Sequence, residues 1–167
     1  MNGNWLRVTP DELSRAVEDL EWAHDYAVDL QMARDPRWAG TDKTWAGLEF
    51  LLLRHGIGIP LVTGAHSFPD PPDVEDDEEW ELVDEGWGYG PPQYLDVAQV
   101  ALMAAYLAPL SPEDLTAGVA LSSMAEVYPH SWKRPEDLRW AAHTLTDAQE
   151  FFALAAKNGE AVVCWLD

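Results

Sequence analysis

Four side chains in this sequence could recognise a ligand and have no evident place in a hydrophobic core. Lys43 stands at a predicted helix start, where the helix dipole disfavours a cation, so a carboxylate partner or an anionic ligand is expected beside it. Trp87 and Tyr89 lie in the Gly- and Pro-rich segment 86–92, which we interpret as a turn that displays both rings. Tyr128 precedes a proline at a predicted chain reversal. We predict a binding surface where these four residues meet; the alternatives are unrelated packing roles and, for Lys43, an ordinary salt bridge.

The sequence carries no pattern typical of a catalytic or metal centre. There is no Gly-x-Ser-x-Gly motif, and the five histidines form neither a pair at helical spacing nor a Cys/His ligand set. Segment 86–92 does not resemble a phosphate loop, because its two prolines lack N–H donors. Cys164 falls within an apolar run, where we expect a core thiol with a raised pKa. We therefore predict no catalytic residue, no metal site and no cofactor.

Helix start and stop signals divide much of the chain into helices. Three segments read as a proline, two acids and a leucine, which is typical of a helix beginning, and Thr9 with Glu12 and Asp96 with Gln99 form capping patterns. We expect Asp42 to cap a further helix. The predicted helices cover residues 9–20, a continuation to Ala33, 42–54, 97–108 and a single long helix over 135–158, closed by Gly159.

Two apolar segments predict how these elements are packed. The helix from Val97 to Ala108 is apolar on nearly every side, which favours a place in the centre of the domain. Residues 161–166 form a β-branched run typical of a strand that is buried on both faces, with residues 5–8 and part of 59–68 as further strands. The fold class expected is therefore α/β, a single compact domain over 1–167 whose small, mostly buried sheet has helices packed around it.

Composition limits the classes of function. The chain has 167 residues, 30 of them acidic and 10 basic, for a net charge of −20, and 47% of its residues are hydrophobic, enough for a folded domain. The run from Pro69 to Glu85 holds ten acids and no base, and we predict that it is a loop. So negative a surface repels nucleic acid and anionic membranes. No signal peptide or membrane span is recognisable and there is a single cysteine, so we expect a cytoplasmic protein.

Three stretches, in order along the chain, resemble a known family. They are segment 42–52 (DKTWAGLEFLL), segment 88–91 (GYGP) with Tyr94-Leu95 shortly after it, and Tyr128-Pro129 followed by the last helix and strand. Together they resemble the YfbM-like family of small bacterial proteins of unknown function. The acidic run and the residues just after Pro129 depart from that pattern. The resemblance implies a compact α/β domain and no particular reaction.

Two functions of different classes remain. The first is a non-enzymatic binding protein that recognises a basic protein partner through its acidic surface and exposed aromatic rings, for example as an immunity or antitoxin-like protein. The alternative is a small-ligand binder or an enzyme of unknown reaction, with a pocket near Lys43, Tyr89 and Tyr128. Salt distinguishes them, because binding through an acidic face weakens with ionic strength far more than binding in a buried pocket.

Overall fold

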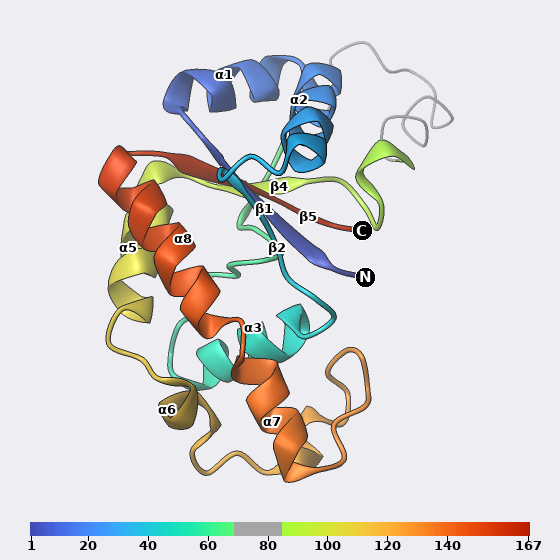
Figure 1. Ribbon diagram of the computed structural model, residues 1–167, viewed down its shortest axis with the longest axis vertical. Coiled ribbons are helices and arrows are strands. Elements are labelled where there is room, and N and C mark those ends of the chain that lie inside the picture. Colours follow the sequence, from blue (N-terminus) through green and yellow to red (C-terminus); the bar gives the residue numbers. More distant parts are fainter. Residues whose placement is uncertain (69–84) are drawn as a thin grey trace.

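The computed structural model describes residues 1–68 and 85–167 and has a five-stranded antiparallel sheet at its centre (Figure 1). The spatial order of the strands is β2-β1-β5-β4-β3, so the first and last strands of the chain lie side by side in the middle of the sheet. The strands are β1 (Gly3–Val8), β2 (Trp38–Gly40), β3 (His66–Ser67), β4 (Gln93–Leu95) and β5 (Ala161–Leu166).

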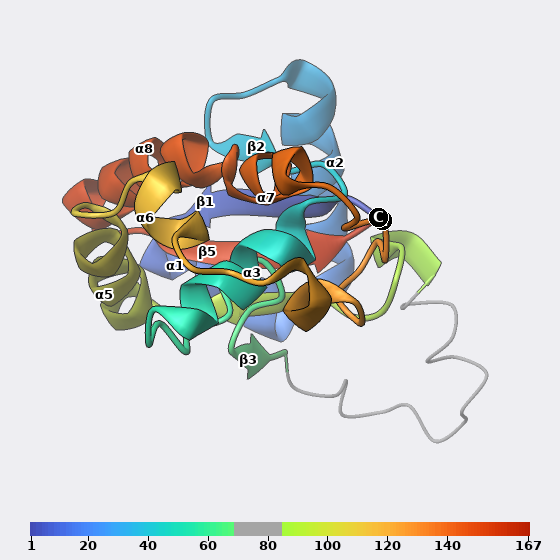
Figure 2. The ribbon, with the colours of Figure 1, turned by 90° about the horizontal axis from the view of Figure 1, so that it is seen from below.

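Helices cover both faces of the sheet. One face carries α1 (Pro10–Glu18) and α2 (Leu20–Ala33), while the remaining helices lie on the opposite side, as the views from two directions show (Figures 1 and 2). These are α3 (Trp45–Arg54), α5 (Val97–Leu107), α6 (Pro112–Thr116), α7 (Pro135–Ala142) and α8 (Leu145–Asn158). Short 3₁₀ turns occupy Glu85–Trp87 and Leu121–Met124. The predicted combination of a small sheet with helices packed around it is confirmed.

The alternation of side chains along the central strands creates two hydrophobic layers. Trp5 of β1 and Val162 and Cys164 of β5 point into the larger layer, beneath α3, α5, α7 and α8. Leu6 and Trp165 belong to the smaller layer, beneath α1 and α2. Since β5 pairs with β1 on one side and β4 on the other, its prediction as an interior strand is confirmed. Burial raises the pKa of the Cys164 thiol, as expected for a core cysteine.

The predicted capping signals hold α1 and α5 in place. Thr9 and Glu12 form a reciprocal capping box at the start of α1, and Asp96 and Gln99 form another at the start of α5. The stripe expected to continue to Ala33 is a separate helix, because Asp19 ends α1 and caps α2 with its side chain. Gly159 ends α8 in the left-handed conformation, as predicted.

Two packing predictions were wrong. Helix α5 lies at the side of the domain, because only one stripe of it, including Val100 and Met103, is buried, while Leu102 is 48% exposed. The single helix expected over 135–158 is two helices, α7 and α8, separated at His143-Thr144. The Thr144 hydroxyl is buried and lies 3.2 Å from the hydroxyl of Thr44, a contact that an uninterrupted helix would not require.

The remaining strand predictions were partly right. Segment 59–68 contributes only the two residues of β3, and β2 and β4, three residues each, were not predicted. The acidic run lies outside the described residues, except at its last position, Glu85. Within residues 1–68 and 85–167, no helix has the length and apolarity needed to cross a membrane.

Candidate binding site

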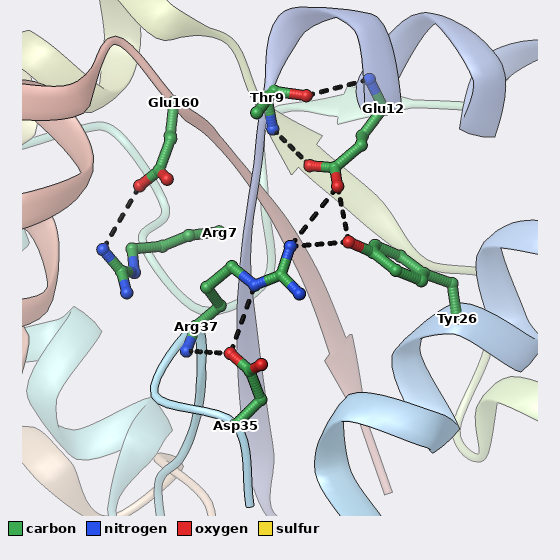
Figure 3. A network of polar contacts seen from close by, with 7 residues as sticks. All are labelled: Arg7, Thr9, Glu12, Tyr26, Asp35, Arg37 and Glu160. Atoms are coloured by element: carbon green, nitrogen blue, oxygen red, sulfur yellow. Dashed lines mark hydrogen bonds and ion pairs between the residues drawn. The ribbon is translucent and has the colours of Figure 1, made fainter. Parts of the chain in front are cut away.

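The most connected cluster of charged side chains lies between α1, α2 and the turn before β2 (Figure 3). Arg37 is at its centre: Nη1 donates to Glu12 Oε1 at 3.3 Å and to the Tyr26 hydroxyl at 2.6 Å, and Nε donates to Asp35 Oδ1 at 3.1 Å. The Tyr26 hydroxyl in turn donates to Glu12. Nearby, Arg7 pairs with Glu160 at 3.2 Å, which ties β1 to the residue before β5.

The electrostatics of this cluster favour a structural role. Burial raises the pKa of Tyr26, and its hydrogen bond to Glu12 raises it further, while the bond to Asp35 raises the pKa of Arg37. Hydrogen bonds from Arg37 lower the pKa of Asp35. At neutral pH the cluster therefore combines ionised carboxylates with a neutral phenol and a charged guanidinium. None of these groups is poised to exchange a proton near pH 7.

Among the residues that the structure describes, no three His, Cys, Asp or Glu side chains are grouped as a metal site would require.

The structure brings the segments of the predicted binding residues to one end of the sheet without joining their side chains. The backbone N–H of Tyr89 donates to Leu166 O at 2.8 Å, and the amino group of Met1 donates to the Tyr128 hydroxyl at 3.0 Å. Lys43 is exposed. It lies two residues after Thr41, whose backbone N–H donates a hydrogen bond to Gly3 O. Tyr89 is exposed, whereas Tyr128 is half-buried and stacks on Trp45.

The prediction that the glycine-rich turn displays Trp87 was wrong, because Trp87 is 3% exposed. Its ring lies 5.3 Å from the ring of His24 and 5.4 Å from that of Trp165, in the smaller hydrophobic layer. The turn can place the ring there because it passes close to the end of β5: a Cβ atom on Gly88 would lie 2.5 Å from Leu166 O.

Two adjoining hollows lie at this end of the sheet, beside α2, and we call them together the strand-end groove. The inner hollow has a volume of about 150 Å³ between α2 and β5, and the outer hollow has about 490 Å³ over the edge formed by β1 and β2. Gln31 and Asp167 line both. The inner hollow is also lined by His24, Ala27, Val28, Gly86, Trp87, Gly88 and Trp165, and the outer one by Asn2, Asn4, Trp38, Gly40, Thr41 and Asp42.

Asn4 is the floor of the outer hollow. It is 2% exposed, and its side-chain Oδ1 accepts a hydrogen bond from Trp38 Nε1 at 3.3 Å, while its Nδ2 is enclosed by protein and has no hydrogen-bond partner within residues 1–68 and 85–167. Turning the amide over would set its NH₂ group against the N–H of Trp38, so this orientation is fixed by its neighbour. This enclosed donor is one of four such side-chain atoms among the described residues, with Arg7 Nε, Trp45 Nε1 and His66 Nε2, so it does not by itself indicate a ligand.

Asp42 forms one wall of the outer hollow. Its Oδ1 accepts from the backbone N–H of Thr44 at 2.8 Å and from the Thr44 hydroxyl, and its Oδ2 accepts from Trp140 Nε1 at 3.0 Å. Burial raises the pKa of Asp42, but these hydrogen bonds outweigh burial and lower it below the ordinary value. Asp42 therefore gives the hollow a fixed negative charge. Asp42 lies in the turn before α3, two residues before the N-cap position Thr44, so the expected cap is present as the hydrogen bond from the Thr44 N–H but not at the N-cap position itself.

The groove residues were missed by sequence reasoning, apart from Trp87. One signal was present: Asn4 is a polar residue inside the strand Gly3–Val8, all of whose residues are buried. Trp38 and Gly40 reach Asn4 only through the pairing of β2 with β1, and β2 was not predicted.

Comparisons with known proteins identify a matching family and a solved structure of similar fold. A family model described as a domain of unknown function (DUF1877) matches residues 1–165. Among solved structures, the chain is similar to YfbM from Escherichia coli, a protein of unknown function, with a TM-score of 0.61 and 17% sequence identity over 100% of both chains. At that identity the similarity shows the fold alone. No curated protein matches the sequence.

Proposed function

The chain belongs to the DUF1877 family, whose description names no activity, and we propose that it is a non-enzymatic binding protein for a basic protein partner. The observation that carries this proposal is the chemistry of the strand-end groove. Three tryptophans line it (Trp38, Trp87 and Trp165), two carboxylates border it (Asp42 and Asp167), and none of its lining residues is Lys or Arg. Trp87 and Trp165 are almost wholly buried, so the accessible aromatic surface is that of Trp38. A part-exposed indole beside two carboxylates, one of which (Asp42) also lies 3.7 Å from His143, favours a cationic guest.

The charge of the whole chain supports the same partner. With 30 acidic and 10 basic residues, the chain attracts a basic protein over distances longer than any contact, which raises the rate of encounter. A specific form of this proposal is an immunity or antitoxin-like protein that neutralises a basic toxin. Such a protein needs no catalytic group of its own.

The alternative of a small-ligand binder or enzyme near Lys43, Tyr89 and Tyr128 has less support. No hydrogen bond or ring contact in the described part of the chain joins these three side chains. None of the three lines the strand-end groove. The charged cluster around Arg37 is held in fixed protonation states and offers no acid–base pair.

Affinity capture followed by measurement with the purified partner tests the proposal. The tagged protein is incubated with lysate of its source organism at about 50 mM and about 500 mM NaCl, because exposed charges are strongly screened at the higher salt. We expect a basic protein to be retained at low salt and released at high salt. The purified partner is then titrated against wild type, Asp167→Asn and the exposed control Glu150→Gln, which removes one charge from α8, outside the groove.

The groove variant should bind the partner about 3- to 5-fold more weakly than wild type, while the control stays close to wild type. Retention only of acidic or neutral proteins, or equal weakening by both variants, would show that the groove does not recognise a basic partner.

A further inference from the structure

We infer that a second copy of this chain docks on the outer face of α5, so that two α5 helices pack antiparallel about a two-fold axis near Leu102. The residues of this α5 face recur at helical spacing on one side of the helix: Ala98, Ala101, Leu102, Ala105 and Tyr106. None of them lines the strand-end groove, so the inference is independent of the proposed function. In both ribbon views α5 lies on the opposite side of the domain from the C-terminal end of the chain, which borders the groove (Figures 1 and 2).

The α5 face is apolar and open to solvent. With its other side the helix packs against α8, β4 and β5, and there Val100, Met103 and Leu107 are buried. On the α5 face, Leu102 is 48% and Tyr106 47% exposed, and the three alanines are exposed as well. Single exposed apolar residues are ordinary, but apolar residues that adjoin along one helix face indicate an interaction surface.

The distribution of charge indicates what covers this face. Among the α-helices that the structure describes, α5 is the only one without an Asp, Glu, Lys or Arg residue, and the uncharged stretch continues to Leu110. Because each copy has a net charge of −20, two copies repel one another and can make close contact only where no carboxylate has to lose its water. A basic partner would find no opposite charge on the α5 face. A second copy is therefore the occupant that this face suits.

The order of large and small side chains makes the α5 face complementary to itself. Ala98 and Tyr106 lie four residues to either side of Leu102, so an antiparallel pair centred there sets each Tyr106 ring against Ala98 of the other copy. A two-fold interface requires this kind of self-complementarity. The alanines allow the two helix axes to approach to about 8 Å, and the antiparallel arrangement places the opposite ends of the two helix dipoles beside one another.

Sedimentation equilibrium of the full chain measures the association directly. A contact centred on one helix about 16 Å long is small beside the roughly 800 Å² per partner of a standard interface, so we expect a weak dimer with a Kd on the order of 100 μM. Protein concentrations between about 10 and about 500 μM span that value. Since salt screens the repulsion between copies, the dimer should form at least about threefold more tightly at about 500 mM than at about 50 mM NaCl. The complex with a basic partner should respond to salt in the opposite direction.

A charge placed on the α5 face tests where the copies meet. Leu102→Glu enters a two-fold interface twice and sets two like charges close to the axis, so dimerisation should weaken at least about tenfold. Leu154→Glu is the matched control, because Leu154 is a leucine of α8 that is 43% exposed and lies outside the α5 face. Both substitutions are at exposed positions, and circular dichroism melts verify that both variants fold.

Cross-linking through cysteine gives a second measurement that does not depend on adding charge. The axis near residue 102 brings the two thiols of a Leu102→Cys dimer together, within reach of a short bismaleimide. Cys164 is free but buried, so it does not compete for the reagent. We expect Leu102→Cys to give at least about tenfold more covalent dimer than Leu154→Cys at the same concentration.

A chain that stays monomeric at every concentration and salt, equal effects of the two glutamate variants, or equal cross-linking of the two cysteine variants would overturn the inference. So would a monomeric chain that captures a different protein through the α5 face, with capture lost in Leu102→Glu. If dimers form as described but no basic protein is captured, the inference stands and the proposed function falls. If a basic protein is captured by a chain that remains monomeric, the proposed function stands and the inference falls.

Discussion

Glu12 and Glu49 are both partly buried carboxylates, yet their surroundings move their pKa values in opposite directions. Burial raises the pKa of Glu12, but hydrogen bonds from Tyr26 and Thr9 outweigh it, so the net pKa is lowered. At Glu49, burial raises the pKa and prevails over hydrogen bonds from Thr63 and Val62. Folding therefore stabilises the ionised form of Glu12 and the protonated form of Glu49.

This difference predicts how the stability of a Glu49→Gln variant depends on pH. Because the folded-state pKa of Glu49 lies above its unfolded value, the wild-type contribution is fully present below the unfolded pKa and is lost as pH rises through the folded pKa. Glutamine keeps an acceptor for the N–H groups of Val62 and Thr63 and does not ionise. We expect the stability of the variant relative to wild type to rise between pH 4 and pH 7, measured by urea unfolding at each pH. A difference that stays constant over this range would contradict the assignment.

Among single residues, only part of the binding site could be predicted from the sequence. Tyr89 is exposed as expected, but Trp87 is a core residue, because the segment that carries it folds back onto Trp165 and His24. Residue type indicates that a tryptophan can recognise a ligand; whether it does depends on contacts with distant segments. The surroundings of Asn4 depend on distant segments in the same way, because its Oδ1 accepts from Trp38 on a neighbouring strand.

Among the elements, those with local signals were predicted best. The capping boxes of α1 and α5 and the apolar strand β5 depend on residues close together in sequence, and all three are present. The break between α7 and α8 has a weaker local signal, Thr144 three residues before Asp147, and the Thr144 side chain makes no capping hydrogen bond. The break coincides with contacts to the segment before α3, where Trp140 binds Asp42 and Thr144 meets Thr44. The strands β2 and β4 are three residues long, too short to show a hydrophobic period.

Local sequence also explains why α5 was wrongly predicted to be central and why the family resemblance could be recognised. The outward side of α5 carries alanines together with Leu102 and Tyr106, so its composition resembles that of a buried helix. The segment 42–52, which carries much of the family resemblance, contains the buried stripe Leu48, Leu51 and Leu52 of α3. Family membership is confirmed because the family model spans residues 1–165.

The turn between Glu85 and β4 yields a prediction at the scale of an element. Gly88 has φ of 91° and approaches the backbone of β5, whereas Gly90 has φ of 98° with no atom near the position of a Cβ. Gly90→Ala should therefore cost only backbone strain, about 1 kcal/mol. Gly88→Ala adds a clash with Leu166 O and should cost clearly more, about 2–4 kcal/mol, because the backbone must move and Trp87 moves with it. Urea unfolding measures both, and equal losses would show that the close approach is unimportant.

For the whole molecule, a net charge of −20 has opposite consequences for folding and for binding. Mutual repulsion of carboxylates weakens the folded state, and salt screens that repulsion, although it also weakens ion pairs such as that of Arg37 with Glu12. With 30 acids and 10 bases, repulsion should prevail. We expect the melting temperature to rise between about 10 mM and about 500 mM NaCl by roughly 3 °C, the shift that about 1 kcal/mol produces in a domain of this size.

Circular dichroism melts in NaCl and in KCl separate this screening from effects of one particular cation, because both salts screen equally at equal ionic strength. Over the same range, affinity for a basic partner should fall, since the attraction that steers the two proteins together is screened as well. A protein that grows more stable while its complex grows weaker is the combination expected when excess charge serves recognition of a partner. A melting temperature that falls with salt would show instead that ion pairs contribute more to the stability of the folded state than repulsion between carboxylates takes from it.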